Sequence, residues 1–138
     1  MKNRLILVFV VALTVGAIVW RFYWQAPAEK GSGAPMVSVT VPELNNEAQA
    51  GETAFNENCA SCHGANAAGQ EGVAPPLVHI IYEPNHHGDQ SFYLAASRGV
   101  RAHHWRFGDM PPVEGITDSE VSEIIAYVRT LQRANGIN

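Results

Sequence analysis

The chain has 138 residues, 46% hydrophobic and 16% charged, which suits one compact domain with an additional segment at one end. Its formal charge of −4 hides an asymmetry, because the part from Glu43 onward carries twelve acidic side chains against five basic ones, all arginine. This balance argues against a nucleic-acid-binding domain, which would need clustered basic groups to neutralise phosphates.

The N-terminal segment has the pattern of an export signal. Lys2 and Arg4 precede sixteen uncharged, mostly apolar residues, and three aromatic residues follow Arg21. The segment is long enough to cross a bilayer if Arg21 extends to the headgroups, and aromatic residues suit the interface. This favours residues 1–24 as an uncleaved anchor with a cytoplasmic N-terminus. The alternative is a signal peptide that is cleaved near Ala28. Both place the remaining chain outside the cytoplasm.

A flexible linker is predicted over residues 25–42, which are rich in Ala, Pro, Gly and Ser. Within it, the alternating MVSVTV is compatible with one short strand. Residues 43–138 are predicted to form a single domain. No stretch within it has the apolar–polar alternation of a strand.

The first helix of the domain is expected to begin at a capping asparagine, Asn45 or Asn46, and to run to the cysteines. A second, short helix is predicted from Asp89 to Gly99. One face of each helix is apolar. These faces comprise Ala48, Gly51, Ala54 and Phe55 in the first helix, and Phe92, Ala95 and Ala96 in the second.

The last helix has the clearest signals. Thr117 and Glu120 form a capping box, and apolar residues follow at helical spacing from Val121 to Leu131. The domain is therefore predicted to be all-α, with two long loops over residues 64–88 and 100–115. Loops of that length without structure of their own usually enclose a bound group.

The motif CASCH contains the only two cysteines, Cys59 and Cys62, followed by His63. A bare thiol pair would oxidise to a disulfide outside the cytoplasm. Redox-active C-x-x-C motifs of the thioredoxin type lie between a strand and a helix, and the absence of predicted strands argues against such a motif here. A structural zinc site needs four ligands, and only three thiol and imidazole groups cluster here. C-x-x-C-H is the signature of haem attachment, because cysteines one turn apart reach both vinyl groups and the histidine points at the iron. The motif therefore predicts that haem occupies both thiols.

With these flanking helices, the chain resembles the class I monohaem cytochromes c over residues 45–135. Gly51 and Phe55 lie eight and four residues before Cys59, as in that family, and IIAY at 124–127 matches its C-terminal helix. The resemblance implies a cytochrome c fold, in which three to four short helices and long loops surround one covalent haem c.

The resemblance also implies the residues that hold the haem. APPL follows His63 at the family's interval, so the Pro75 carbonyl would accept a hydrogen bond from the imidazole. Met110, followed by two prolines, matches the distal ligand, so His63 and Met110 would ligate the iron and leave no open position. Trp105 and Arg98 are candidate partners of the haem propionates. The aromatic residues expected to line the pocket are Tyr82, Phe92, Tyr93 and Phe107.

Five further histidines lie in the long loops: His79, His86, His87, His103 and His104. If one of them ligated the iron, the haem would be bis-histidine and its potential lower. The favoured interpretation is that they are exposed loop residues that titrate near neutral pH, because Met110 already supplies a ligand. The two His-His pairs could also bind an adventitious metal, but no carboxylate or thiol completes a convincing ligand set.

The sequence thus predicts an electron carrier rather than an enzyme, anchored to a bacterial inner membrane with its haem domain in the periplasm. It would accept electrons from a quinol-oxidising complex or a dehydrogenase and pass them to a terminal oxidase or reductase. Its acidic surface favours redox partners with a basic docking face, and no small-molecule substrate is expected. The alternatives are a fixed haem c subunit of a larger respiratory or dehydrogenase complex, and a bis-histidine or gas-binding haem sensor.

Overall fold

The computed structural model describes residues 13–17, 20 and 33–138, and the chain divides into two units after Lys30. Residues 13–17 are helical. Among the described residues, no helix combines the length and the apolar composition that a membrane span requires. The predicted anchor lies largely outside the described residues, and the alternative cleavage site near Ala28 lies wholly outside them.

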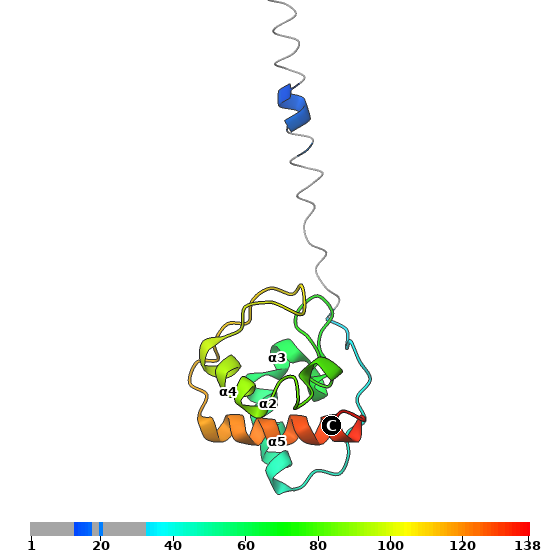
Figure 1. The fold of residues 1–138 in the computed structure, drawn as a ribbon, viewed down its shortest axis with the longest axis vertical. Helices are drawn as coiled ribbons and strands as arrows, with labels where there is room; N and C mark the ends of the chain where they lie inside the picture. Colours follow the sequence, from blue (N-terminus) through cyan, green and yellow to red (C-terminus); the bar gives the residue numbers. More distant parts are fainter. Residues whose placement is uncertain (1–12, 18–19, 21–32) are drawn as a thin grey trace, which may run out of the picture. The chain divides into compact units, whose positions relative to one another are not determined.

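The described part of the second unit is helical and contains no strand (Figure 1). Its elements, in chain order, are α2 (Asn46–Asn58), α3 (Ala60–His63), the 3₁₀ helices η1 (Ala65–Ala67) and η2 (Ile80–Tyr82), α4 (Asp89–Arg98) and α5 (Asp118–Ala134). The three predicted helices are α2, α4 and α5, and the mostly helical prediction is confirmed. The three shorter elements fall in segments where the sequence pattern predicted no helix.

The core lies where α2 crosses α5 (Figure 1). α2 begins as predicted, because the Asn45 side chain accepts a hydrogen bond of 2.9 Å from the Ala48 backbone N–H. At the crossing, the rings of Phe55 and Tyr127 pack with their centroids 5.6 Å apart, and both residues are fully buried. Gly51 makes the close approach possible, since a Cβ there would lie 1.9 Å from the Glu123 carbonyl oxygen.

The predicted capping box is present at the start of α5. The Thr117 backbone N–H donates to Glu120 Oε2 over 2.8 Å, and the Glu120 N–H donates to Thr117 Oγ1 over 3.3 Å. The bonds from the Thr117 hydroxyl and backbone lower the pKa of the Glu120 carboxyl. Both interactions favour the ionised carboxylate in the folded protein.

We expect Thr117→Ala to lower the free energy of unfolding by about 1 kcal/mol at neutral pH, because α5 loses its cap. A folded-state pKa below the unfolded one stabilises the protein above the unfolded pKa, and this contribution disappears as the pH falls through the folded pKa. The difference between wild type and variant should therefore narrow in acid. Urea denaturation at neutral and acidic pH measures it, and a difference that stays constant would contradict the carboxylate's part in the cap.

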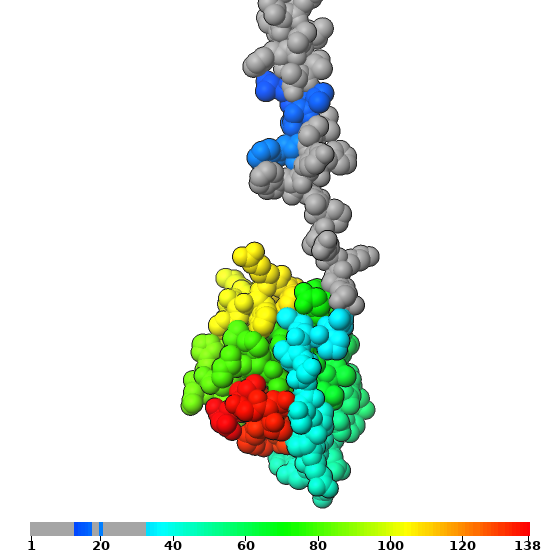
Figure 2. Space-filling model, turned by 90° about the vertical axis from the view of Figure 1, so that its right-hand side faces the viewer, coloured from blue at the N-terminus to red at the C-terminus, as the bar shows by residue number. Residues whose placement is uncertain are grey.

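Residues 33–41, which the sequence assigns to the linker, instead lie along the domain. The backbone N–H groups of Met36 and Val37 donate to the Ala68 carbonyl over 3.1 and 3.2 Å. The Asn135 side chain binds both the N–H and the carbonyl of Thr40, over 2.9 and 2.8 Å. Figure 2 shows this segment in cyan beside the red C-terminal end. The segment bends at Met36 and Val37 and forms no strand.

Candidate functional site

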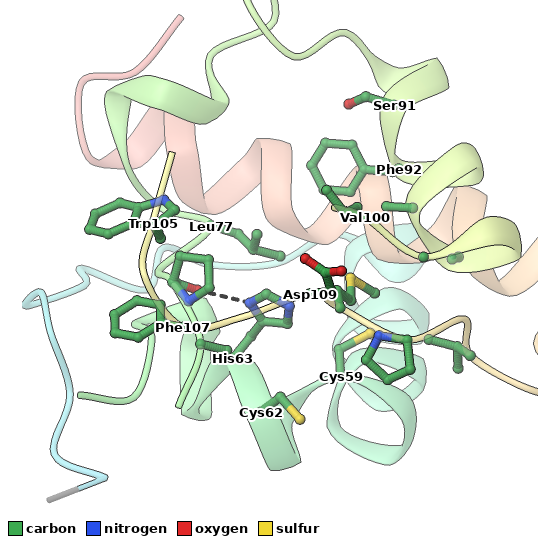
Figure 3. Close-up of a pocket in the computed structure, with 18 of the residues that line it drawn as sticks. Cys59, Cys62, His63, Leu77, Ser91, Phe92, Val100, Trp105, Phe107 and Asp109 are labelled. Carbon is green, nitrogen blue, oxygen red and sulfur yellow. Dashed lines mark hydrogen bonds between the residues drawn. The ribbon is translucent and has the colours of Figure 1, made fainter. Parts of the chain in front are cut away.

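A largely apolar cavity of about 390 Å³ lies between α3, α4, α5 and the loops of the domain (Figure 3). This volume is in the range of small-molecule and cofactor sites, roughly 300–1,000 Å³. Its lining brings together residues that are far apart in the sequence. The chemically distinctive ones are Cys59, Cys62, His63, Trp105 and Met110.

His63 is oriented by a hydrogen bond inside the cavity. Its Nδ1 lies 2.8 Å from the Pro75 carbonyl oxygen, drawn as a dashed line in Figure 3. A carbonyl only accepts, so Nδ1 carries the proton and Nε2 keeps its lone pair. Burial lowers the pKa of His63, and the bond to Pro75 opposes this in smaller part. The result is a neutral imidazole with Nε2 available to a metal ion, held as metal-ligating histidines usually are.

Both cysteines are free thiols, and Cys59 lies at the junction of α2 and α3 whereas Cys62 lies within α3. The backbone N–H groups of Cys62 and His63 both bond the Cys59 carbonyl, over 3.1 and 2.9 Å, which fixes this junction. Burial, and then the neighbouring Cys62, raise the pKa of Cys59 to about 11. A redox-active C-x-x-C pair needs a thiol of lowered pKa, so this environment disfavours dithiol exchange chemistry.

Met110 reaches the cavity from the loop that follows α4. Val100 and Met110 form a two-way backbone bridge with both N–H···O distances at 2.9 Å. Gly99 permits this arrangement, because its φ is +73° and a Cβ there would lie 2.4 Å from the Met110 carbonyl oxygen. The Val113 N–H also bonds the Ala96 carbonyl over 2.8 Å. Met110 is thus held to Val100, just after α4, and the chain that follows the methionine is bonded to α4 itself.

Trp105 carries a buried donor that lacks an acceptor. Its ring stacks on Phe107 with centroids 5.9 Å apart, and its Nε1 is buried with no hydrogen-bond partner among the described residues. Burial raises the pKa of Tyr82, and the nearby Trp105 indole lowers it in smaller part. The Trp105 N–H nevertheless has no acceptor at hydrogen-bonding geometry. A buried N–H is normally paired, so a ligand with an acceptor group is expected beside it. Arg98, by contrast, is exposed and does not line this cavity.

Of the aromatic residues expected at the pocket, Tyr82, Phe92 and Phe107 line it, whereas Tyr93 does not. Phe92 and Ala95 were predicted to be buried and are only half-buried here. Both line the cavity, which explains the difference, because a bound group would cover them. The orphaned donor, the apolar walls, the free thiols and the neutral imidazole all fit a haem.

The loop histidines divide into two sets. His79 lies apart, with its Nδ1 accepting from the Ile81 N–H over 3.2 Å and its ring against Trp105. The other four form one cluster, and three of them, His87, His103 and His104, line the cavity. The cluster consists of His86, His87, His103 and His104. The His104 ring contacts the other three, and the rings of His86 and His87 contact each other. Desolvation, followed by repulsion from the other three, lowers the pKa of His104.

A buried arginine on α5 supports this region and was not predicted. Arg129 donates to Asp89 Oδ1 over 2.8 Å, to the Tyr82 carbonyl over 2.7 Å, to Gln132 Oε1 over 2.6 Å and to the His87 carbonyl. It joins α5 to the start of α4 and to the loop before it. The signal was available, since Arg129 lies four residues after Ile125 on the apolar side of the helix.

Residues 48–132 match the cytochrome c family model. The chain is also similar to three curated proteins described as cbb3-type cytochrome c oxidase subunits. FixP of Sinorhizobium medicae is 32% identical over 106 residues, covering 67% of this chain and 33% of that protein. CcoP of Azospirillum brasilense is 34% identical over 92 residues, covering 61% and 28%. FixP of Rhizobium meliloti is 33% identical over 106 residues, with 67% and 33% covered. The chain therefore spans about a third of these relatives' length.

Proposed function

Because the chain belongs to the cytochrome c family, which binds covalent haem c, we propose that it passes single electrons between protein partners through one haem with histidine–methionine ligation. Attached through Cys59 and Cys62, the haem supplies a one-electron iron couple. The observation that carries the proposal is that both thiols, His63 and Met110 line one cavity.

The chain's own residues have distinct roles in this proposal. His63 would provide Nε2 to the iron, and its bond to the Pro75 carbonyl prevents the ring from rotating. Met110 would provide its thioether sulfur, and the two following prolines stiffen its loop. The apolar cavity walls would exclude water from the iron. Trp105 would donate its unpaired N–H to a haem propionate.

We expect Met110→Ala to abolish the weak long-wavelength band of methionine bound to ferric iron, and to lower the reduction potential by on the order of 100 mV or more. The reduced variant should bind carbon monoxide, because its sixth position is open. The measurements are absorption spectra of ferric and ferrous protein, matured with haem-attachment machinery, and a redox titration.

Met36→Ala is the matched control, because Met36 does not line the cavity. It should keep both the band and the potential. Covalent haem without the band in the wild type would contradict methionine ligation. Absence of covalent haem would contradict the whole proposal.

We place this activity at a bacterial inner membrane, with residues 1–24 as the anchor and the haem domain in the periplasm. The donor would be a quinol-oxidising complex or a dehydrogenase, and the acceptor a terminal oxidase or reductase. Twelve acidic side chains against five arginines from Glu43 onward favour partners with a basic docking face. Electron-transfer rates with such a partner should fall as salt is raised.

A second candidate is a fixed haem subunit of a respiratory oxidase. It is favoured by the names of the relatives, all of which are cbb3-type oxidase subunits. Copurification from detergent-solubilised membranes distinguishes the two. A stable complex with large oxidase subunits favours the fixed subunit, whereas recovery of the chain alone favours the mobile carrier.

A further inference from the structure

Two histidine pairs from different loops meet beside the haem cavity. His86 and His87 precede α4, and His103 and His104 lie in the loop that follows it. One ring nitrogen from each of His86, His87 and His104 lies within 4.8 Å of the others. His86 Nε2 and His104 Nε2 are 3.3 Å apart.

These distances suit a tetrahedral metal ion. Two imidazole nitrogens at about 2.0–2.1 Å from Zn²⁺ in a tetrahedral site are separated by about 3.3 Å. The His86–His104 pair already has this spacing. His86 and His104 are exposed, so their side chains can rotate toward the half-buried His87.

His87 is held as a metal-ligating histidine is usually held. Its Nδ1 lies 2.6 Å from the Ile81 carbonyl oxygen and therefore carries the proton, which leaves the lone pair of Nε2 for a metal ion. This contact fixes both the tautomer and the ring orientation.

The two loops are themselves anchored. Arg129, only 8% exposed in its side chain, donates to the carbonyls of Tyr82 and His87 and so ties the first loop to α5. In the second loop, the Ala102 N–H donates to Asp109 Oδ1 over 2.8 Å. The ligands therefore start from fixed backbone positions, which reduces the entropy lost when a metal binds.

We propose that His86, His87 and His104 bind one borderline divalent transition-metal ion, Zn²⁺ or Cu²⁺, with the fourth position open to solvent. Three imidazoles without a carboxylate or thiolate suit these ions better than Mg²⁺ or Ca²⁺. Among the residues that the structure describes, this is the one group whose donor atoms converge closely enough. His87 and His104 also line the haem cavity, but neither is a proposed iron ligand, so the metal site does not depend on electron-carrier function.

The test is calorimetric titration of Zn²⁺ into the haem-loaded protein, purified without a polyhistidine tag. Wild type should bind about one ion per chain. The double variant His86→Gln/His104→Gln should bind at least about tenfold more weakly. His79→Gln removes a histidine outside the cluster and the cavity lining, and should bind as wild type does.

The absorption spectrum of each variant shows whether it is folded with its haem environment intact. Wild-type protein without saturable Zn²⁺ binding would overturn the proposal, as would equal affinity in the double variant. A changed haem spectrum in the double variant but not in His79→Gln would also overturn it, because the cluster would then be supplying a haem ligand.

Discussion

Replacing Gly51 by alanine is expected to lower the free energy of unfolding by about 2–3 kcal/mol. The added Cβ would lie 1.9 Å from the carbonyl oxygen and 2.5 Å from the carbonyl carbon of Glu123, and 2.9 Å from Tyr127 Cβ. Two of these atoms are backbone atoms of α5, so no side-chain rotation relieves the clash. The helices must separate, and the fully buried Phe55 and Tyr127 lose their packing. Chemical denaturation of the haem-loaded protein measures the change.

The sign of this effect is informative, because local helix propensity predicts the opposite. Glycine to alanine within a helix normally stabilises by about 0.5–1 kcal/mol. The matched control is Gly88→Ser at the N-cap of α4, where the nearest neighbour of a new Cβ is the Pro84 carbonyl at an ordinary 3.5 Å. This control should be neutral or slightly stabilising. If Gly51→Ala were stabilising too, α2 and α5 would not cross as closely as the structure shows.

The helices and their crossing were predictable because their signals are local or carried by spacing. The Asn45 cap, the Thr117–Glu120 box and the apolar side of α5 each depend on residues within a few turns. The resemblance to the class I cytochromes c, carried in part by Gly51 and Phe55, implied the crossing. The residues proposed to hold the haem were likewise predicted from short motifs, and Cys59, Cys62, His63, Pro75, Trp105 and Met110 line one cavity.

What the sequence did not show depends on long-range contacts. Nothing in residues 33–41 signals that Thr40 meets Asn135, 95 positions later. The histidine pairs are 17 residues apart and gave no complete ligand set individually, so only the fold brings them together. Arg98, a predicted partner of the propionates, lies on α4 outside the cavity lining. Arg129 lies within the apolar periodicity of α5, but its bonds to the Tyr82 and His87 carbonyls depend on the fold.

Arg129→Leu is expected to lower the free energy of unfolding by roughly 2–4 kcal/mol. The leucine fills space but donates nothing, so the His87 carbonyl and Gln132 Oε1 lose a charged donor. The Tyr82 carbonyl keeps its bond from Gln132 Nε2, at 3.0 Å, which limits the cost. The exposed Asp89 is readily hydrated and contributes little. Chemical denaturation again measures the change.

Arg133→Leu is the matched control, because it removes an exposed arginine from the same helix. Among the described residues, its side chain bonds only Thr130 Oγ1, over 2.9 Å. It should change stability by no more than about 0.5 kcal/mol. Arg129→Leu should also weaken Zn²⁺ binding although no histidine is changed, because the loop that carries His87 loses its anchor on α5. A variant as stable as the control would show that the Arg129 bonds only offset the cost of burying the charge. Lost stability with unchanged Zn²⁺ affinity would mean that the Ile81 carbonyl alone holds the His87 ring in place.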